Sequence, residues 1–323
     1  MKHRLLYSIL SIALLASACS REAEPVTIHR FEQLLFSTPA NELQAALVQE
    51  QHTYNTPLLN VTPNDALFME ALQQFIDDPV VSRLYVITDS LYHDLGWLEQ
   101  ELGEAMGRAR EVCPEVDYKR FYTLITADFS NYANRVFCSD SDLAISIETY
   151  ALGHVDEMQM FGVPSYLMNL CTRDHLLPDC MAAAARNHIV LPDGDLTFLD
   201  HAIAEGKALY FLDQVLPDTP DSLKIRYTSE QLDWIEENVG NVWGWLIQNQ
   251  VLYSSDAAQL RNLIDDAPKT NAFGDGSAPR TSDYIGWQIV KAYMKKSGSS
   301  MSQLFAETNS RKILEASGWR PKS

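Results

Sequence analysis

The spacing of apolar residues changes period twice along this chain, and that change constrains the fold most. Between residues 84 and 106 apolar side chains recur every three or four positions, which is the spacing of one helix face. Leu143, Ile145 and Ile147 then alternate with smaller or polar residues, as in a strand. From residue 164 the helical spacing returns. The sequence therefore predicts an α+β fold, predominantly helical, with a small mixed sheet between two helical parts.

Local start signals predict where several helices begin. Thr62-Pro63-Asn64-Asp65 predicts a cap followed by proline at the first helical position, and Asp78-Pro79 predicts a second start. Residues 228–231 have the sequence of a capping box. Further helices are expected over 164–171, 179–189, 196–215, 229–250, 256–264 and 282–296. Residues 121–127 are expected to form a strand, and residues 216–228 an irregular, exposed loop.

The first twenty residues have the features of a processing signal. Lys2 and Arg4 precede an apolar stretch that is shorter than the roughly 20 residues a membrane span needs. Leu15-Ala16-Ser17-Ala18-Cys19 resembles a bacterial lipobox, although Ala16 stands where leucine is favoured. This resemblance implies a lipid on the Cys19 sulfur and removal of residues 1–18. The alternative is an ordinary cleaved signal peptide with an incidental cysteine.

The rest of the chain shows no linker, repeat or low-complexity tract. We therefore expect a polar tether over residues 19–30 and one globular domain over residues 31–323. Several acyl chains on Cys19 would hold the protein durably at a membrane. The expected location is the cell envelope, on the periplasmic side and at the outer membrane rather than the inner one.

The charge balance excludes one large class of partner. Against 25 Lys and Arg stand 43 Asp and Glu, which gives a formal net charge of -18. Removal of Lys2 and Arg4 with the leader makes this -18 minus 2, or -20. Nucleic-acid-binding proteins usually carry a basic patch that neutralises phosphates. No nucleic-acid partner is expected.

Four cysteines remain after Cys19, and they match no metal-binding spacing. In an oxidising compartment they would form two disulfides, with three connectivities to choose from. The other interpretation is that they are buried small hydrophobes. The sequence leaves both open for Cys113, Cys138, Cys171 and Cys180.

The sequence has no GxSxG, GxxxxGK, GxGxxG or HExxH motif. One layout nevertheless resembles that of gluzincin proteases: a sheet, a short helix, and a later helix carrying a glutamate, here Glu205. His201 lies four residues before Glu205 and therefore on the same helix face. Gly206 follows in mid-helix at a cost of about 1 kcal/mol relative to alanine, which predicts close packing against another segment.

The short helix lacks the zinc-binding motif. The five HExxH positions would be Ala184 to His188, of which only His188 matches, and Arg186 adds a positive charge beside the metal position. A catalytic zinc needs three protein ligands and a base. We therefore expect no catalytic residue, metal or cofactor, with His188, His201 and Glu205 as candidates for a vestigial site. In the plainer interpretation His188 flanks a helix and Glu205 makes an internal hydrogen bond.

Three segments carry a family resemblance: Ile28 to Phe36, Leu199 to Ser255, and Tyr284 to Val290. They resemble the gliding-motility-associated lipoprotein GldB family of Bacteroidetes. The resemblance implies an envelope lipoprotein needed for surface motility in gliding members, without established enzymatic activity. It also implies distant similarity to predicted zinc-dependent proteases, hence a degenerate zincin (gluzincin)-like scaffold.

Three hypotheses follow. The leading one is a non-catalytic envelope lipoprotein that acts through envelope protein partners. The second is a zinc-dependent metallohydrolase with an atypical site. The third is a lipid-anchored protein that binds a peptide or an envelope polymer.

Overall fold

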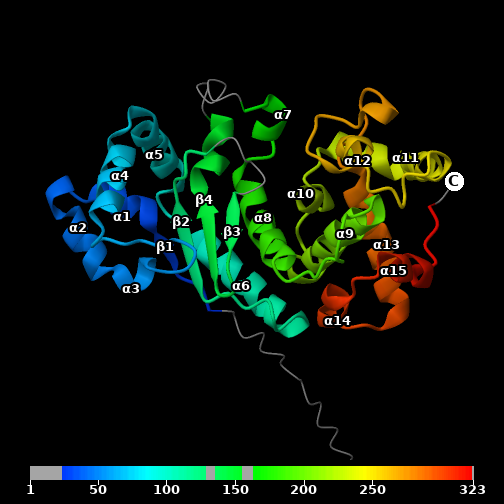
Figure 1. Cartoon of the computed structure of the whole chain (residues 1–323), viewed down its shortest axis with the longest axis horizontal. Coiled ribbons are helices and arrows are strands. Elements are labelled where there is room, and N and C mark those ends of the chain that lie inside the picture. The colour runs from blue at the N-terminus through cyan, green and yellow to red at the C-terminus, as the bar shows by residue number, and fades with distance from the viewer. Residues whose placement is uncertain (1–23, 129–134, 155–162, 322–323) are drawn as a thin grey trace, which may run out of the picture.

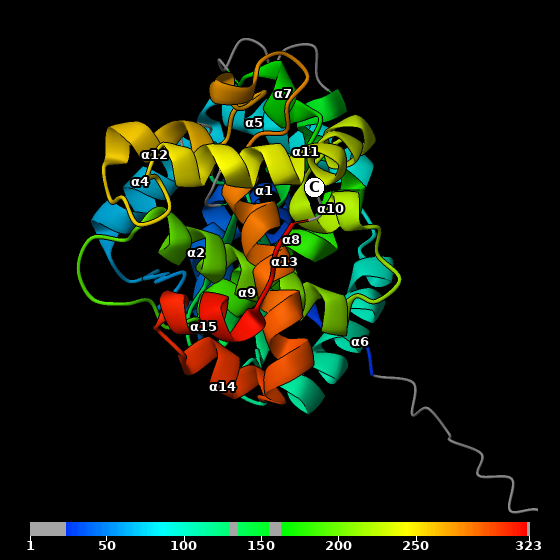
Figure 2. The same ribbon diagram turned by 90° about the vertical axis from the view of Figure 1, so that its right-hand side faces the viewer.

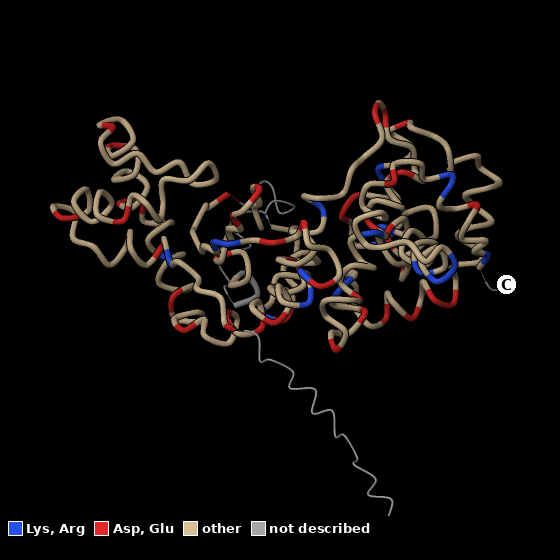
Figure 3. The backbone as a smooth tube through the Cα atoms, turned by 90° about the horizontal axis from the view of Figure 1, so that it is seen from below, with Lys and Arg blue, Asp and Glu red and all other residues tan. Residues whose placement is uncertain are grey.

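The computed structural model describes residues 24–128, 135–154 and 163–321. Two helical parts flank a small sheet, one built from the N-terminal residues and the other from the C-terminal residues (Figure 1). The predicted predominance of helix around a small mixed sheet is confirmed. Acidic residues occur on both helical parts and around the sheet (Figure 3).

Aspartate caps define two of the N-terminal helices. The helices of this part are α1 (Phe31–Ser37), α2 (Ala40–Gln49), α3 (Gln51–Tyr54), α4 (Ala66–Asp77), α5 (Pro79–Tyr92) and α6 (Gly96–Val112). The Asp78 carboxylate accepts backbone N–H groups at the start of α5, as predicted. Asp65 caps α4 in the same way, so Pro63 precedes the helix and the prediction of proline at its first position is wrong.

The sheet joins residues from distant parts of the chain. Its strands are β1 (Ile28–Arg30), β2 (Arg120–Leu124), β3 (Val136–Cys138) and β4 (Asp142–Ser146), in the order β1-β2-β4-β3. The β1–β2 and β2–β4 pairs are parallel, and β3 is antiparallel to β4. The β1 strand corrects the expected tether over 19–30. The backbone N–H of Ile28 is bound to the Glu99 carboxylate at 2.8 Å, so the fold begins before residue 31.

β4 is buried along its whole length, although its alternating sequence is typical of a strand with one exposed face. Leu143 and Ile145 belong to the large buried cluster shared with the C-terminal helices. Ala144, on the opposite face, belongs with Tyr122 to a second cluster that the N-terminal helices cover. The small size of Ala144 allows that covering layer to approach the sheet.

The C-terminal part contains the helices that position the candidate site. They are α7 (Ser165–Met168), α8 (Arg173–Arg186), α9 (Phe198–Val215), α10 (Asp221–Ile225), α11 (Ser229–Gln248), α12 (Ala257–Ile264), α13 (Thr281–Ser297), α14 (Met301–Ala306) and α15 (Ser310–Ser317). The described residues also include the 3-10 helices η2 (Ile147–His154) and η4 (Asn271–Phe273). The predicted capping box at Thr228 is present.

Two expectations for this part are wrong. α8 begins at Arg173 rather than near residue 179 and includes Pro178. Pro178 is the sixth residue of α8, so it cannot donate to the Asp174 carbonyl oxygen, and its ring crowds that oxygen. The stretch 216–228 is not an exposed loop, because it contains α10 and because Lys224 to Tyr227 are buried.

All four cysteines of the globular part are free thiols in the structure, and three of them are buried. This agrees with the interpretation of buried small hydrophobes and assigns no disulfide among them. Burial raises the pKa of Cys113 and of Cys138 to about 11, which leaves both thiols protonated and unreactive at neutral pH.

α9 and α13 cross in direct backbone contact, and Figure 2 shows α13 running over α9. A β-carbon on Gly286 would lie 1.6 Å from the carbonyl oxygen of Ala202, and one on Gly206 would lie 2.3 Å from the carbonyl carbon of Gly286. The close packing predicted from Gly206 is therefore confirmed. Beside the crossing, fully buried Trp287 donates its indole N–H to Asp213 at 2.9 Å.

We expect Gly286→Ala to destabilise the protein by about 3 kcal/mol, because the added methyl group forces two packed helices apart. Denaturant unfolding of the purified protein measures this change. Gly244→Ala in α11 is the matched control. Apart from its chain neighbours and the backbone of its own helix, no described atom lies within 4 Å of its added β-carbon, so that variant should gain up to about 1 kcal/mol. Unchanged stability of Gly286→Ala would contradict the crossing.

Candidate functional site

The last residue of α8 and the middle of α9 meet at the position expected for a vestigial site. The Arg186 guanidinium donates to both carboxylate oxygens of Glu205, with Nε–Oε1 at 3.0 Å and Nη2–Oε2 at 2.7 Å. Nearly half of the Arg186 side chain and 30% of the Glu205 side chain are exposed. Burial raises the pKa of Glu205, but Arg186 more than offsets this effect and keeps the carboxyl ionised.

The structure does not bring His188 to Glu205. Helix α8 ends at Arg186, and His188 packs edge-on against Tyr118, with ring centroids 5.9 Å apart. Burial lowers the pKa of His188, whose charged neighbours are Glu115 and Asp140. His201 is close enough to Glu205 to lower the pKa of that carboxyl. Within the described ranges, no three His, Cys, Asp or Glu side chains form a group able to hold a metal ion.

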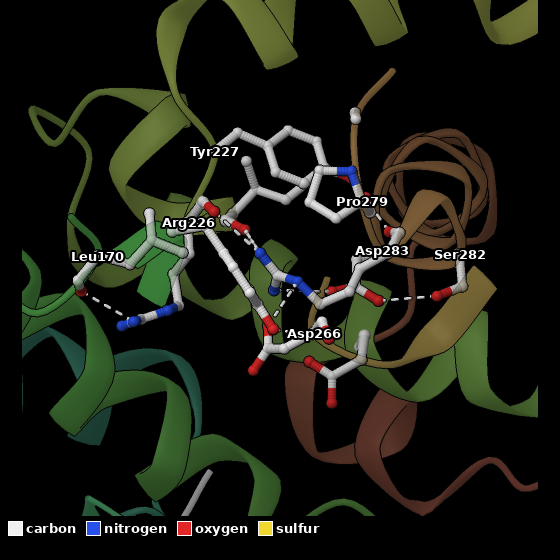
Figure 4. Close-up of polar contacts among 12 residues, drawn as sticks. Leu170, Arg226, Tyr227, Asp266, Pro279, Ser282 and Asp283 are labelled. Atoms are coloured by element: carbon white, nitrogen blue, oxygen red, sulfur yellow. Dashed lines mark hydrogen bonds and ion pairs between the residues drawn. The ribbon is translucent and has the colours of Figure 1, made fainter. Parts of the chain in front are cut away.

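A further group of contacts lies around Arg280 and includes Asp266 and Asp283, which Figure 4 labels. Arg280 has a left-handed backbone (φ 41°) just before α13. Its Nε lies 3.0 Å from Asp266, and its Nη1 lies 3.2 Å from Asp283. Its Nη2 donates to the carbonyl oxygens of Ile225 and Arg226. The Arg280 guanidinium thus connects the end of α10 to Asp266, which follows α12, and to Asp283 in the first turn of α13.

A second buried network centres on Asp179 in the middle of α8. Its carboxylate accepts hydrogen bonds from Arg135 at 2.8 Å, from Tyr150 at 2.9 Å and from Arg226. Arg226 also donates to the Leu170 carbonyl oxygen at 2.8 Å, a contact that Figure 4 includes. Burial raises the pKa of Asp179, but the two guanidiniums outweigh burial and hold that pKa well below its usual range.

Together these contacts form a set of alternating charges in which each carboxylate is neutralised by a guanidinium. Such an arrangement fixes the helices relative to one another. Asp283 differs from the rest: burial raises its pKa to about 7, Arg280 opposes that effect, and the charge of Glu205 adds to it. It is therefore the member of the set that changes charge near neutral pH.

Sequence reasoning identified Glu205 and the charge of Arg186 but missed the other members. Arg226, Arg280 and Asp283 have no recognisable motif, and both arginines adopt the left-handed backbone that favours glycine. In the sequence, each of these three is simply a charged residue next to apolar ones in a stretch of mixed composition. That signal is too common to identify a site.

The fold and the site define a helical α+β protein with an Arg186–Glu205 ion pair between α8 and α9. The family model described as "Gliding motility protein GldB" matches residues 16–321. The chain therefore belongs to the GldB gliding-motility lipoprotein family, a class of membrane-anchored envelope proteins. No curated protein and no solved structure matches the chain significantly. None of the helices in the described ranges is long and apolar enough to cross a membrane.

We expect Asp283→Asn to change how stability depends on pH. The folded pKa of about 7 lies above the ordinary 3.8, so the native state holds a proton that the unfolded state loses between those values. The contribution of Asp283 to the stability of the wild type therefore falls as pH rises from about 4 to 7, and the asparagine variant avoids this loss. The free energy of unfolding of the variant minus that of the wild type should therefore be larger at pH 8 than at pH 4, by on the order of 1 to 4 kcal/mol.

Denaturant unfolding at a series of pH values measures this difference. The control is Asp193→Asn, a change at an exposed residue, which should shift stability equally at every pH. A parallel pH dependence for Asp283→Asn and wild type would show that Asp283 has an ordinary pKa.

Proposed function

We propose that this chain is a non-catalytic, lipid-anchored protein of the cell envelope that acts through protein partners. The family supports the envelope lipoprotein part of this proposal. The Arg186–Glu205 pair supports the non-catalytic part. In a gluzincin the corresponding glutamate binds zinc, whereas here both oxygens of Glu205 accept hydrogen bonds from a guanidinium. Zinc could bind Glu205 only if Arg186 moved away, and the positive charge of Arg186 opposes a second cation.

The α8 positions that would carry a zinc ligand and a base also support this proposal. Ala184 and Ala185 are completely buried in the large core cluster. Their methyl groups form a packing surface between α8 and its neighbours. We propose that a degenerate zincin-like scaffold has been converted here, by apolar packing and an ion pair, into a rigid platform.

The alternative of an atypical metallohydrolase makes a different prediction for metal content. We expect the purified protein to carry far less than one zinc ion per chain after exposure to zinc and dialysis, because partial ligand sets bind weakly. Elemental analysis measures this. Glu205→Gln should leave the metal content unchanged. One tightly held zinc per chain, together with peptide cleavage that depends on Glu205, would establish the hydrolase instead.

The function in cells is tested by replacing the chromosomal gene with Glu205→Gln or with an Arg186→Gln, Glu205→Gln double variant. We expect the double variant to support the function of the wild type whenever its protein level is matched. If both variants lose function at a normal protein level, the interpretation that the Arg186–Glu205 pair is only structural is wrong.

The proposed lipid anchor is Cys19, which lies outside the described residues. Cys19→Ser should release the protein from the membrane fraction or stall its processing, because serine cannot carry the thioether-linked lipid. Cell fractionation with mass spectrometry of the N-terminus measures both outcomes. Cys138→Ser is the control and should remain at the membrane. If Cys19→Ser is processed and fractionates as wild type does, Cys19 is not the anchor.

A further inference from the structure

A pocket of about 400 Å³ lies between α6, the start of α8 and the segment around α10. Its size is within the range of small-ligand pockets. It is lined by Trp97 and Glu101 from α6, by Arg173 and Asp174 from α8, and by Asp218 in the segment before α10. None of these residues belongs to the charge networks described above.

Three carboxylates and one guanidinium face this pocket, so its lining carries a net charge of three negative and one positive, or -2. Among the described residues, no cation lies within ion-pair distance of Glu101, Asp174 or Asp218. This contrasts with the Arg186–Glu205 site, where the carboxylate is fully engaged. Negative charge gathered in a hollow raises the local concentration of cations.

The one cation of the lining stacks on an aromatic ring and forms no ion pair with these carboxylates. The Arg173 guanidinium lies over the ring of Trp97, 4.0 Å from the ring centroid, in a cation–π contact. Burial raises the pKa of Glu101, Glu104 and Asp174 raise it further, and Arg173 opposes them. After burial, Arg173 is the largest influence on the pKa of Glu101, yet that pKa stays raised, so the Glu101 carboxylate would still be stabilised by a further cation.

Asp174 has a local role as well, since it lies in the first turn of α8, where a negative charge is favourable. Glu101 and Asp218 have no such role. Arg173 lies at the same N-terminal end of α8, where the helix dipole disfavours a positive charge. Its place there is best explained by the Trp97 ring and the carboxylates that surround it.

The geometry points to a binding pocket for a lysine or arginine side chain of a partner protein, with Trp97 forming the wall and Glu101 and Asp218 neutralising the cation. Arg173 occupies in the free protein the place that the partner's cation takes. This inference rests on the proposed partner-binding role and gives that role a surface and a chemistry. A basic segment also complements the acidic protein as a whole.

The test is a calorimetric titration of the full mature protein in detergent with acetyl-Gly-Lys-Gly-amide and its arginine counterpart, at low ionic strength. The norleucine and glutamate versions of the peptide are the ligand controls. We expect binding of the two cationic peptides only, and a loss of at least tenfold in affinity in the Glu101→Gln, Asp218→Asn double variant. Glu111→Gln, an exposed position at the other end of α6, is the matched control and should bind as wild type does.

Arg173→Gln gives the discriminating result. It frees the Trp97 ring and removes a like charge, so it should tighten binding of the cationic peptides about threefold or more. Weaker binding in Arg173→Gln, or equal binding of the glutamate or norleucine peptide, would overturn the inference. These outcomes are independent of zinc content and peptide cleavage, so a failed pocket and a failed non-catalytic role are told apart.

Discussion

The contact between the backbones of α9 and α13 is the constraint on which the C-terminal part depends. Because Gly206 and Gly286 have no side chains, the two helices approach until a β-carbon would overlap a carbonyl group. That approach places the Trp287 indole within hydrogen-bond distance of Asp213. It also holds Glu205, one residue before Gly206, beside the end of α8. The two glycines also come from the two C-terminal segments that carry the family resemblance.

The ion pairs around this crossing contribute more to the precise relative placement of the helices than to the free energy of unfolding. Taking charges out of water costs several kcal/mol per ion, and a buried pair often does little more than recover that cost. Removing one partner is far more damaging, since it leaves an unpaired buried charge. Arg280 and Asp179 each hold three separate segments, so their value lies in excluding other packings of α8, α10 and α13.

Sequence patterns predicted the elements that have long periods or clear caps and missed those that depend on distant partners. The helix starting at Thr228 and the packing at Gly206 followed from local signals. β1 has three residues, two of them polar, so only its pairing with β2 reveals it. α10 was hidden by a proline- and aspartate-rich composition, although Ile225 and Tyr227 are buried. The pairing of Arg186 with Glu205 required the relative placement of two helices, which no period encodes.

Helix α8 carries the binding pocket at one end and the Arg186–Glu205 pair at the other. Arg173 and Asp174 line the pocket at its start, Asp179 anchors its middle, and Arg186 pairs with Glu205 at its end. A helix of this length spans about 20 Å, more than twice a Debye length at physiological salt. Occupation of the pocket therefore has little direct electrostatic effect on the Arg186–Glu205 pair. The Arg186–Glu205 pair can hold one end of α8 in place while the other end takes part in the proposed partner binding.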